Sequence, residues 1–165
     1  MKAKTLSAIR YGVMAIIITC FISQAGISAQ DEGPERRLGG VWEVKTTPRN
    51  CTTGEPIPAF AFEALYTFHR DGTVISTVSG GTPLPFHGLW RRELGWSDYS
   101  FRTRRILRNP DQSFAGKQEI GGTLTLSESG DEYTSDEYMI VFSIDGVPTT
   151  AACISSVATR FKLNP

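Results

Sequence analysis

Gly40-Val41-Trp42 begins the part of the chain that we expect to fold, and the residues after it alternate in polarity. Trp42, Val44 and Thr46 occupy every second position, and charged residues stand between them. Because successive side chains of a strand point to opposite faces of a sheet, this alternation predicts a half-buried β-strand. Trp42 is therefore expected to point into the core.

The rest of the chain also favours strands. No stretch keeps a helical period of 3.6 residues, and runs of β-branched and aromatic residues recur between turn residues such as Asp71-Gly72. The expected strands are residues 40–47, 60–69, 73–79, 88–94, 98–108, 116–126, 132–144 and 150–163. Short links between consecutive strands predict an all-β fold, an eight-stranded antiparallel up-and-down β-barrel whose closure removes exposed edges. No substantial helix is expected after the N-terminal segment.

A Gly-x-Trp on the first strand and an Arg near the end of the last strand resemble the signature of the calycins, the lipocalin-like barrels. Gly40, Trp42 and Arg160 stand at the matching positions. The resemblance implies that Trp42 lies across the closed end of the barrel and that the Arg160 guanidinium stacks over its ring. It also implies a long first loop at the open end, here residues 48–59. Lipocalins usually have a C-terminal helix, which this sequence does not indicate, so a broader calycin-like bacterial family is favoured.

Two pairings relate the first and last strands. In an antiparallel pair, the numbers of facing residues have a constant sum. Trp42 with Arg160 gives 202, and Cys51 with Cys153 gives 204. The close agreement predicts that the two strands are neighbours and close the barrel. In an exported protein, Cys51 and Cys153 are expected to form a disulfide near the open end; two free buried thiols are the alternative.

The first 29 residues predict a secretory signal peptide. Basic residues precede an apolar run at 13–22, and small residues follow it up to Ala29. The run is shorter than the ~20 apolar residues that a membrane-spanning helix needs. We expect cleavage near Ala29, with Ala25 as the alternative. The exported product, periplasmic or extracellular and without a membrane span, would have a flexible lead-in at 30–38 and one barrel domain over 39–165.

Composition disfavours several function classes. Removal of the signal takes three of the 17 basic residues and none of the 17 acidic ones, which leaves a net charge of about −3. Nucleic-acid binding needs a basic face and is not expected. His69 and His87 have no Cys, Asp or Glu at ligand spacing, so neither a metal site nor a cofactor is expected. Gly121-Gly122 lies inside a strand pattern and predicts a bulge or bend.

The alternation of side chains along each strand predicts the inner wall of the barrel. Strand seven is expected to turn Tyr138 and Phe142 inward and Glu137 outward, and Leu94 is expected inside. Arg105 shares the inward face of its strand and can hold the carboxylate of an apolar ligand, with an internal salt bridge or a shifted register as alternatives. The predicted ligand-binding residues are Phe62, Tyr66, Phe68, Trp90, Phe101, Arg105, Tyr138 and Phe142.

The sequence therefore predicts an exported small-molecule binding protein that holds an apolar, carboxylate-bearing ligand in a barrel cavity. No catalytic motif is found, so binding is favoured over catalysis. Two alternatives stay open. One is an isomerase- or cyclase-type enzyme on a similar barrel. The other is a filled barrel that acts through its surface as a structural or interaction module.

Overall fold

The structure is a computed structural model that describes residues 38–80 and 84–163. The predicted signal peptide and residues 30–37 of the predicted lead-in lie outside the described residues. Within the described ranges, no helix is long and apolar enough to cross a membrane.

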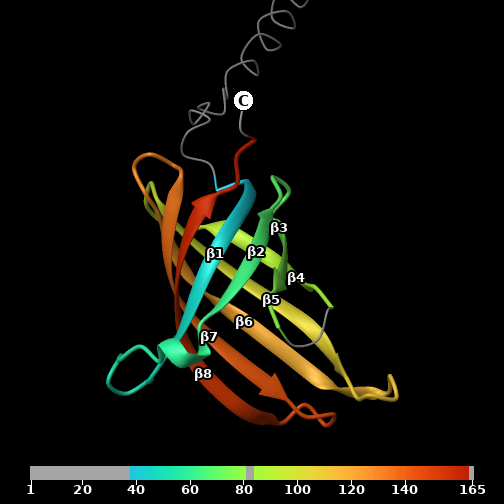
Figure 1. The fold of residues 1–165 in the computed structure, drawn as a ribbon. Coiled ribbons are helices and arrows are strands. Elements are labelled where there is room, and N and C mark those ends of the chain that lie inside the picture. The colour runs from blue at the N-terminus through green and yellow to red at the C-terminus, as the bar shows by residue number, and fades with distance from the viewer. Residues whose placement is uncertain (1–37, 81–83, 164–165) are drawn as a thin grey trace, which may run out of the picture. The chain divides into compact units, whose positions relative to one another are not determined.

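Eight strands form one closed antiparallel barrel in which every strand pairs with its neighbours in the chain, and the last strand pairs with the first (Figure 1). This confirms the predicted all-β up-and-down barrel. The described segments hold one short 3₁₀ helix, η2, and no longer helix. The elements are β1 (Gly40–Arg49), η2 (Pro58–Phe60), β2 (Phe62–Phe68), β3 (Thr73–Val78), β4 (Phe86–Arg92), β5 (Asp98–Arg108), β6 (Phe114–Leu126), β7 (Glu132–Phe142) and β8 (Pro148–Arg160).

The register between β1 and β8 agrees with the pairing expected from the sequence. Trp42 faces Arg160, and seven residues further along β1, Arg49 faces Cys153. Cys51 lies in the turn just beyond β1 and is bonded to Cys153, with the two Cα atoms 5.2 Å apart. The disulfide therefore ties the first long loop to β8 at the end of the barrel opposite Trp42.

Arg160 joins three segments at the closed end. Its guanidinium carbon lies 4.3 Å from the centre of the Trp42 ring. It donates from Nη1 to the carbonyl of Gly39 at 2.8 Å and from Nε to the carbonyl of Gly130 at 3.0 Å. Gly40 has a φ of +134°, and a Cβ at this position would lie 2.8 Å from Arg160 Nη1. The Gly-x-Trp sequence therefore has a steric reason, because a side chain at position 40 would displace the guanidinium.

Leu38 also belongs to this end, which corrects the predicted flexible lead-in at its last residue. Its side chain is fully buried, and its carbonyl accepts a hydrogen bond of 2.9 Å from Trp42 Nε1. The buried indole N–H needs a partner, and the chain supplies one by folding back just before β1.

Aromatic rings fill the closed half of the barrel. Phe68 contacts the rings of Trp90, Phe101 and Tyr133 at centroid distances of 6.0, 6.2 and 6.3 Å. Trp42 lies 4.9 Å from Tyr133. These separations are typical of tilted and edge-to-face packing, which adds to the free energy of simple burial. This half is therefore a packed core.

The face predicted for β7 is wrong. Tyr133, Ser135 and Glu137 are buried, while Tyr138 is 36% exposed and Phe142 lies on the same outer face. The register decides this, because Ser135 faces Ser156 on β8, whose side chain points inward. The apolar alternation of residues 138–142 suggested an inner face, but it lies along the outside of the sheet.

Tyr138 has an outer partner that explains its place. It faces Gly121 on β6, and a Cβ on Gly121 would lie 2.7 Å from the Tyr138 hydroxyl oxygen. That hydroxyl donates to Glu119 Oε1 at 3.3 Å. Arg102 and Arg104 also bind the Glu119 carboxylate, at 2.7 and 2.6 Å. The Tyr138 side chain thus packs over the backbone of Gly121, which has no side chain of its own to cover it on the outer face of the barrel.

The bulge expected at Gly121-Gly122 and the inward position expected for Leu94 are wrong. Gly121-Gly122 forms no bulge, because pairing continues through both residues and the irregularities fall at Leu107/Arg108 and Val141/Phe142. A Cβ on Gly122 would meet the backbone of Asp136, so close approach of β6 and β7 requires glycine there. Leu94 is fully exposed in the turn after β4, because the strand ends before it.

Candidate functional site

The predicted ligand-binding residues separate into three groups. Tyr66, Phe68 and Phe101 are buried and pack against one another. Trp90 joins them, with its Nε1 donating to the carbonyl of His69 at 2.8 Å. Tyr138 and Phe142 point away from the interior, as described above. Phe62 and Arg105 lie on the inward-facing positions of their strands toward the open end.

Arg105 is half-buried and held by residues of two other strands. Its Nε donates to Gln118 Oε1 at 2.8 Å. Its guanidinium carbon lies 4.6 Å from the centre of the buried Phe86 ring. Gln118 in turn donates from Nε2 to Met139 Sδ at 2.7 Å. Burial lowers the pKa of Arg105, but an arginine keeps its charge at neutral pH.

A buried carboxyl group also points into the barrel. Glu137 is only 6% exposed, and Ser135 Oγ donates to its Oε1 at 2.5 Å. Ser156 approaches the same carboxyl, and its hydroxyl forms a 3.1 Å hydrogen bond with Thr46 Oγ1. Burial raises the pKa of Glu137, the Ser135 and Ser156 hydroxyls oppose this, and the charge of Asp136 adds to it. The net pKa is above the usual value for a glutamate.

Two tyrosine hydroxyls share this region. Burial is the main cause that raises the pKa of Tyr66 and of Tyr133 well above the usual value, and the charge of Glu137 contributes to both. Ser76 faces Tyr66 on the neighbouring strand, and its hydroxyl opposes these causes by acting as a hydrogen-bond partner that lowers the pKa of Tyr66. The Ser76 hydroxyl is buried, and among residues 38–80 and 84–163 it has no partner that meets strict hydrogen-bond geometry. Both phenols therefore stay neutral at physiological pH.

We call this set the Glu137 cluster; its members are Thr46, Tyr66, Ser76, Tyr133, Ser135, Glu137 and Ser156. None of the ion pairs among the described residues includes Glu137. A buried carboxylate without a cation is costly, and a barrel that only had to be filled would be more stable with an apolar residue there. Such groups concentrate at functional sites, so the Glu137 cluster and Arg105 together form the candidate site.

Sequence reasoning missed Glu137, Phe86, Gln118 and Met139. Phe86 was assigned to a loop, but it is the first residue of β4. The sequence predicted that Glu137 would point outward into the solvent, because a charged residue is rarely buried. The sequence does contain a signal for its burial. Tyr133, Ser135 and Glu137 share one face of the strand, so if Tyr133 points inward, Glu137 must point inward as well.

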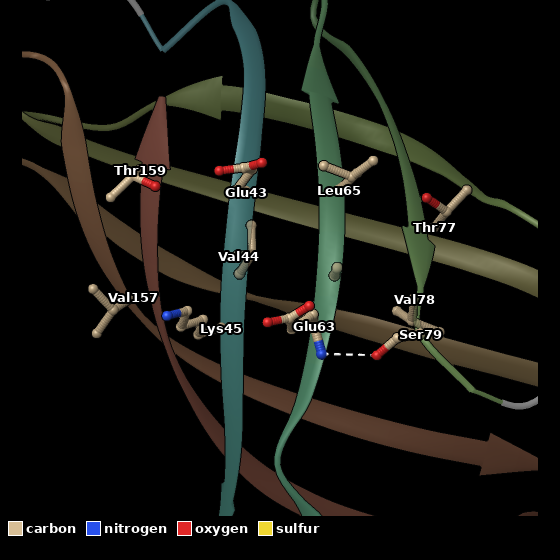
Figure 2. Close-up of a pocket in the computed structure, with 11 residues that line it drawn as sticks. Glu43, Val44, Lys45, Glu63, Leu65, Thr77, Val78, Ser79, Val157 and Thr159 are labelled. Atoms are coloured by element: carbon tan, nitrogen blue, oxygen red, sulfur yellow. Dashed lines mark hydrogen bonds between the residues drawn. The ribbon is translucent and has the colours of Figure 1, made fainter. Parts of the chain in front are cut away.

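A hollow of about 740 Å³ lies over the outer face of β1, β2, β3 and β8, where Figure 2 shows its lining side chains. The lining mixes charges and apolar groups; it comprises Glu43, Val44, Lys45, Glu63, Ala64, Leu65, Thr77, Val78, Ser79, Val157 and Thr159. Val44 and Ala64 have their side chains in the core and contribute to the hollow from β1 and β2. This hollow contains neither Arg105 nor any member of the Glu137 cluster.

Within residues 38–80 and 84–163, no three His, Cys, Asp or Glu side chains come together as a metal ion would require. No protein-family model matches the chain, and no curated protein matches it either. The chemistry of the inner wall is therefore the basis for a functional proposal.

Glu137 is expected to make the protein less stable as the pH rises. Its pKa is raised in the folded state above the ~4.3 of an unfolded glutamate. The folded state therefore binds more protons between the two values, and the free energy of unfolding falls as pH rises through that window. Replacing Glu137 with Gln keeps the shape without the charge, and should raise the free energy of unfolding at pH 8 by about 1–3 kcal/mol.

Urea denaturation at pH 5 and pH 8 measures this effect. Glu43→Gln is the matched control, because Glu43 is exposed on β1 and its replacement should change stability by less than about 0.5 kcal/mol. A Glu137→Gln variant that is less stable than the wild type at pH 8 would contradict the prediction.

Proposed function

We propose that the protein is an exported, calycin-like small-molecule binding protein whose ligand enters the open end of the barrel. The closed barrel, the stacking of Arg160 on Trp42 and the predicted signal peptide support this proposal. The Cys51–Cys153 disulfide also fits an oxidising compartment. The ligand is an apolar molecule with a carboxylate head group.

The observation that carries the proposal is the environment of Arg105. Gln118 orients its guanidinium, and the Phe86 ring packs against it. An oriented, partly desolvated guanidinium suits a carboxylate, which it can bind through two parallel hydrogen bonds. Phe62, Phe86 and Met139 supply apolar surface on the same half of the barrel for the body of the ligand.

Replacing Arg105 with Ala is expected to weaken the binding of a fluorescent fatty acid about 10- to 100-fold, because a charge-assisted hydrogen bond is lost. A fluorescence titration of wild type and variant measures the change. Arg108→Ala is the matched control, since Arg108 lies on the same strand but binds the carbonyl of Gln112 in the exposed turn. Equal affinities for wild type and Arg105→Ala would remove Arg105 from the site.

A filled barrel that acts through its surface is the second candidate. The rings that occupy the closed half favour it, because they leave only the open half for a ligand. The same titration separates the two candidates: a wild-type protein that binds no apolar probe is a filled barrel.

A further inference from the structure

The outer face of β4, β5 and β6, which we call the basic face, differs in charge from the rest of the barrel wall. It holds two acids, Asp98 and Glu119, and five cations, namely Arg91, Arg102, Arg104, Arg108 and Lys117. The outer faces of the other five strands hold two cations, Lys45 and Arg49, and four acids, namely Glu43, Glu63, Glu132 and Asp136. The net charge is therefore +3 on the basic face and −2 on the rest of the wall. Glu93, in the turn after β4, pairs with Arg91 at 2.9 Å and lowers the first value to +2.

Two guanidinium groups at the centre of the basic face are held by a single carboxylate. Arg102 binds the two oxygens of Glu119 at 2.7 and 2.9 Å, and Arg104 binds Oε2 at 2.6 Å. The Glu119 side chain is 3% exposed beneath them, while Arg102 and Arg104 are 64% and 49% exposed. Neither Nη1 group donates to a residue within 38–80 or 84–163. The pair therefore has one charge more than Glu119 neutralises, and it has oriented N–H groups left for an anion from solvent.

Exposed apolar side chains lie beside these cations. Leu89 faces Arg102 across β4 and β5 and is 67% exposed. Ile106 stands two residues beyond Arg104, faces Lys117 on β6 and is 50% exposed. A soluble polyanion would satisfy the cations but would leave both apolar side chains in water. An anionic phospholipid surface has phosphates for the guanidinium groups and, just below the headgroups, acyl chains for the leucine and the isoleucine.

We propose that the basic face docks the protein on the surface of an anionic phospholipid bilayer. Arg102 and Arg104 bind lipid phosphates, Lys117 adds attraction beside them, and Leu89 and Ile106 enter the headgroup layer. The docking is peripheral and goes beyond the proposed function, because it involves the outside of the barrel. It holds whether or not the interior binds a ligand.

Vesicle flotation with the protein lacking its predicted signal peptide tests the proposal. The wild type is expected to bind vesicles of equal parts phosphatidylglycerol and phosphatidylcholine, and to bind pure phosphatidylcholine at least tenfold more weakly. Raising the salt from about 0.1 to about 1 M shortens the screening length from about 10 to about 3 Å, so it should release most of the bound protein.

Matched variants locate the contact on the barrel wall. Lys117→Gln should weaken vesicle binding about fivefold, whereas Lys45→Gln, which removes the same charge from the outer face of β1, should not. Leu89→Ser should also weaken it several-fold, in contrast to Val157→Ser on the outer face of β8, where the side chain is 57% exposed. The triple variant Arg102→Gln, Arg104→Gln, Glu119→Gln removes the guanidinium pair without leaving a buried carboxylate unpaired, and should weaken binding about 5- to 30-fold. Urea denaturation verifies that each variant is folded.

Three results would overturn the inference. The first is equal binding of the wild type to anionic and neutral vesicles, or to neither. The second is an equal loss of binding in Lys117→Gln and Lys45→Gln, which would show an effect of total charge and not of the basic face. The third is binding to soluble polyglutamate, measured by calorimetry, without binding to vesicles, which would assign the face to an acidic protein. If the triple variant does not fold, the two lysine variants and the two serine variants still decide the question.

Discussion

Replacing Trp42 with alanine is expected to lower the free energy of unfolding by about 3–5 kcal/mol, as for other large-to-small changes in a packed core. Trp42 is fully buried, and three contacts depend on it. Its ring packs against Tyr133 and under the Arg160 guanidinium, and its indole N–H satisfies the Leu38 carbonyl. Truncation would leave a cavity, an unsatisfied carbonyl and a partly buried cation without its ring.

The matched control is Trp96→Ala. Trp96 is 71% exposed in the turn between β4 and β5, so its loss should change stability by about 0.5 kcal/mol or less. Arg160→Met is expected to lie between the two, because methionine retains part of the aliphatic packing of the arginine but not its hydrogen bonds to Gly39 and Gly130. Equal denaturation midpoints for wild type and Trp42→Ala would contradict the closed-end structure.

Removal of the Cys51–Cys153 disulfide is expected to have an effect of similar size. The bond links residues 102 positions apart. In the chain-entropy model, cross-linking a loop of this length stabilises the folded state by about 4–5 kcal/mol, because the unfolded chain loses freedom. The double replacement of Cys51 and Cys153 by serine should therefore lower the denaturation midpoint strongly, while the β1–β8 pairing keeps the barrel closed.

Two measurements check this. Urea denaturation gives the free energy of unfolding of the oxidised wild type, the reduced wild type and the double serine variant. Reduction of the wild type should lower this free energy by the same amount as the double replacement does. Thiol titration of the unfolded, unreduced mature protein should find no free cysteine, since Cys20 lies in the predicted signal peptide. Two titratable thiols in that protein would show that the bond does not form.

The proposed binding residue Arg105 and the core around Trp42 lie in opposite halves of the barrel, while the Cys51–Cys153 disulfide stabilises the open end. The closed half is held by Trp42, Arg160 and the rings around Phe68. The open half contains Arg105. Stability is therefore expected to depend on the closed-half core and on the disulfide, and ligand binding on Arg105. Glu137→Gln is expected to improve stability, because it removes a buried charge from the inner wall.

Local alternation and turn chemistry were enough to predict the barrel. The strands were found because polarity alternates along them, and the closure followed from the pairing of Trp42 with Arg160 and of Cys51 with Cys153. The alternation of polarity is local, and each pairing involves only two residues. Both can therefore be recognised without knowledge of how the side chains pack. The inward position of Arg105 was predicted by the same alternation.

The tertiary structure alone decided which face of β7 is inside and what the inner wall can bind. Alternation separates the two faces of a strand but does not say which of them points into the barrel. On β7 the more apolar face lies on the outside. Gly121 leaves room for Tyr138 on the outer wall, and Glu137 is then turned inward, where Ser156 of β8 and Tyr66 of β2 meet it. These partners come from strands far apart in the sequence, and burial of a carboxyl group becomes tolerable only when they are brought together.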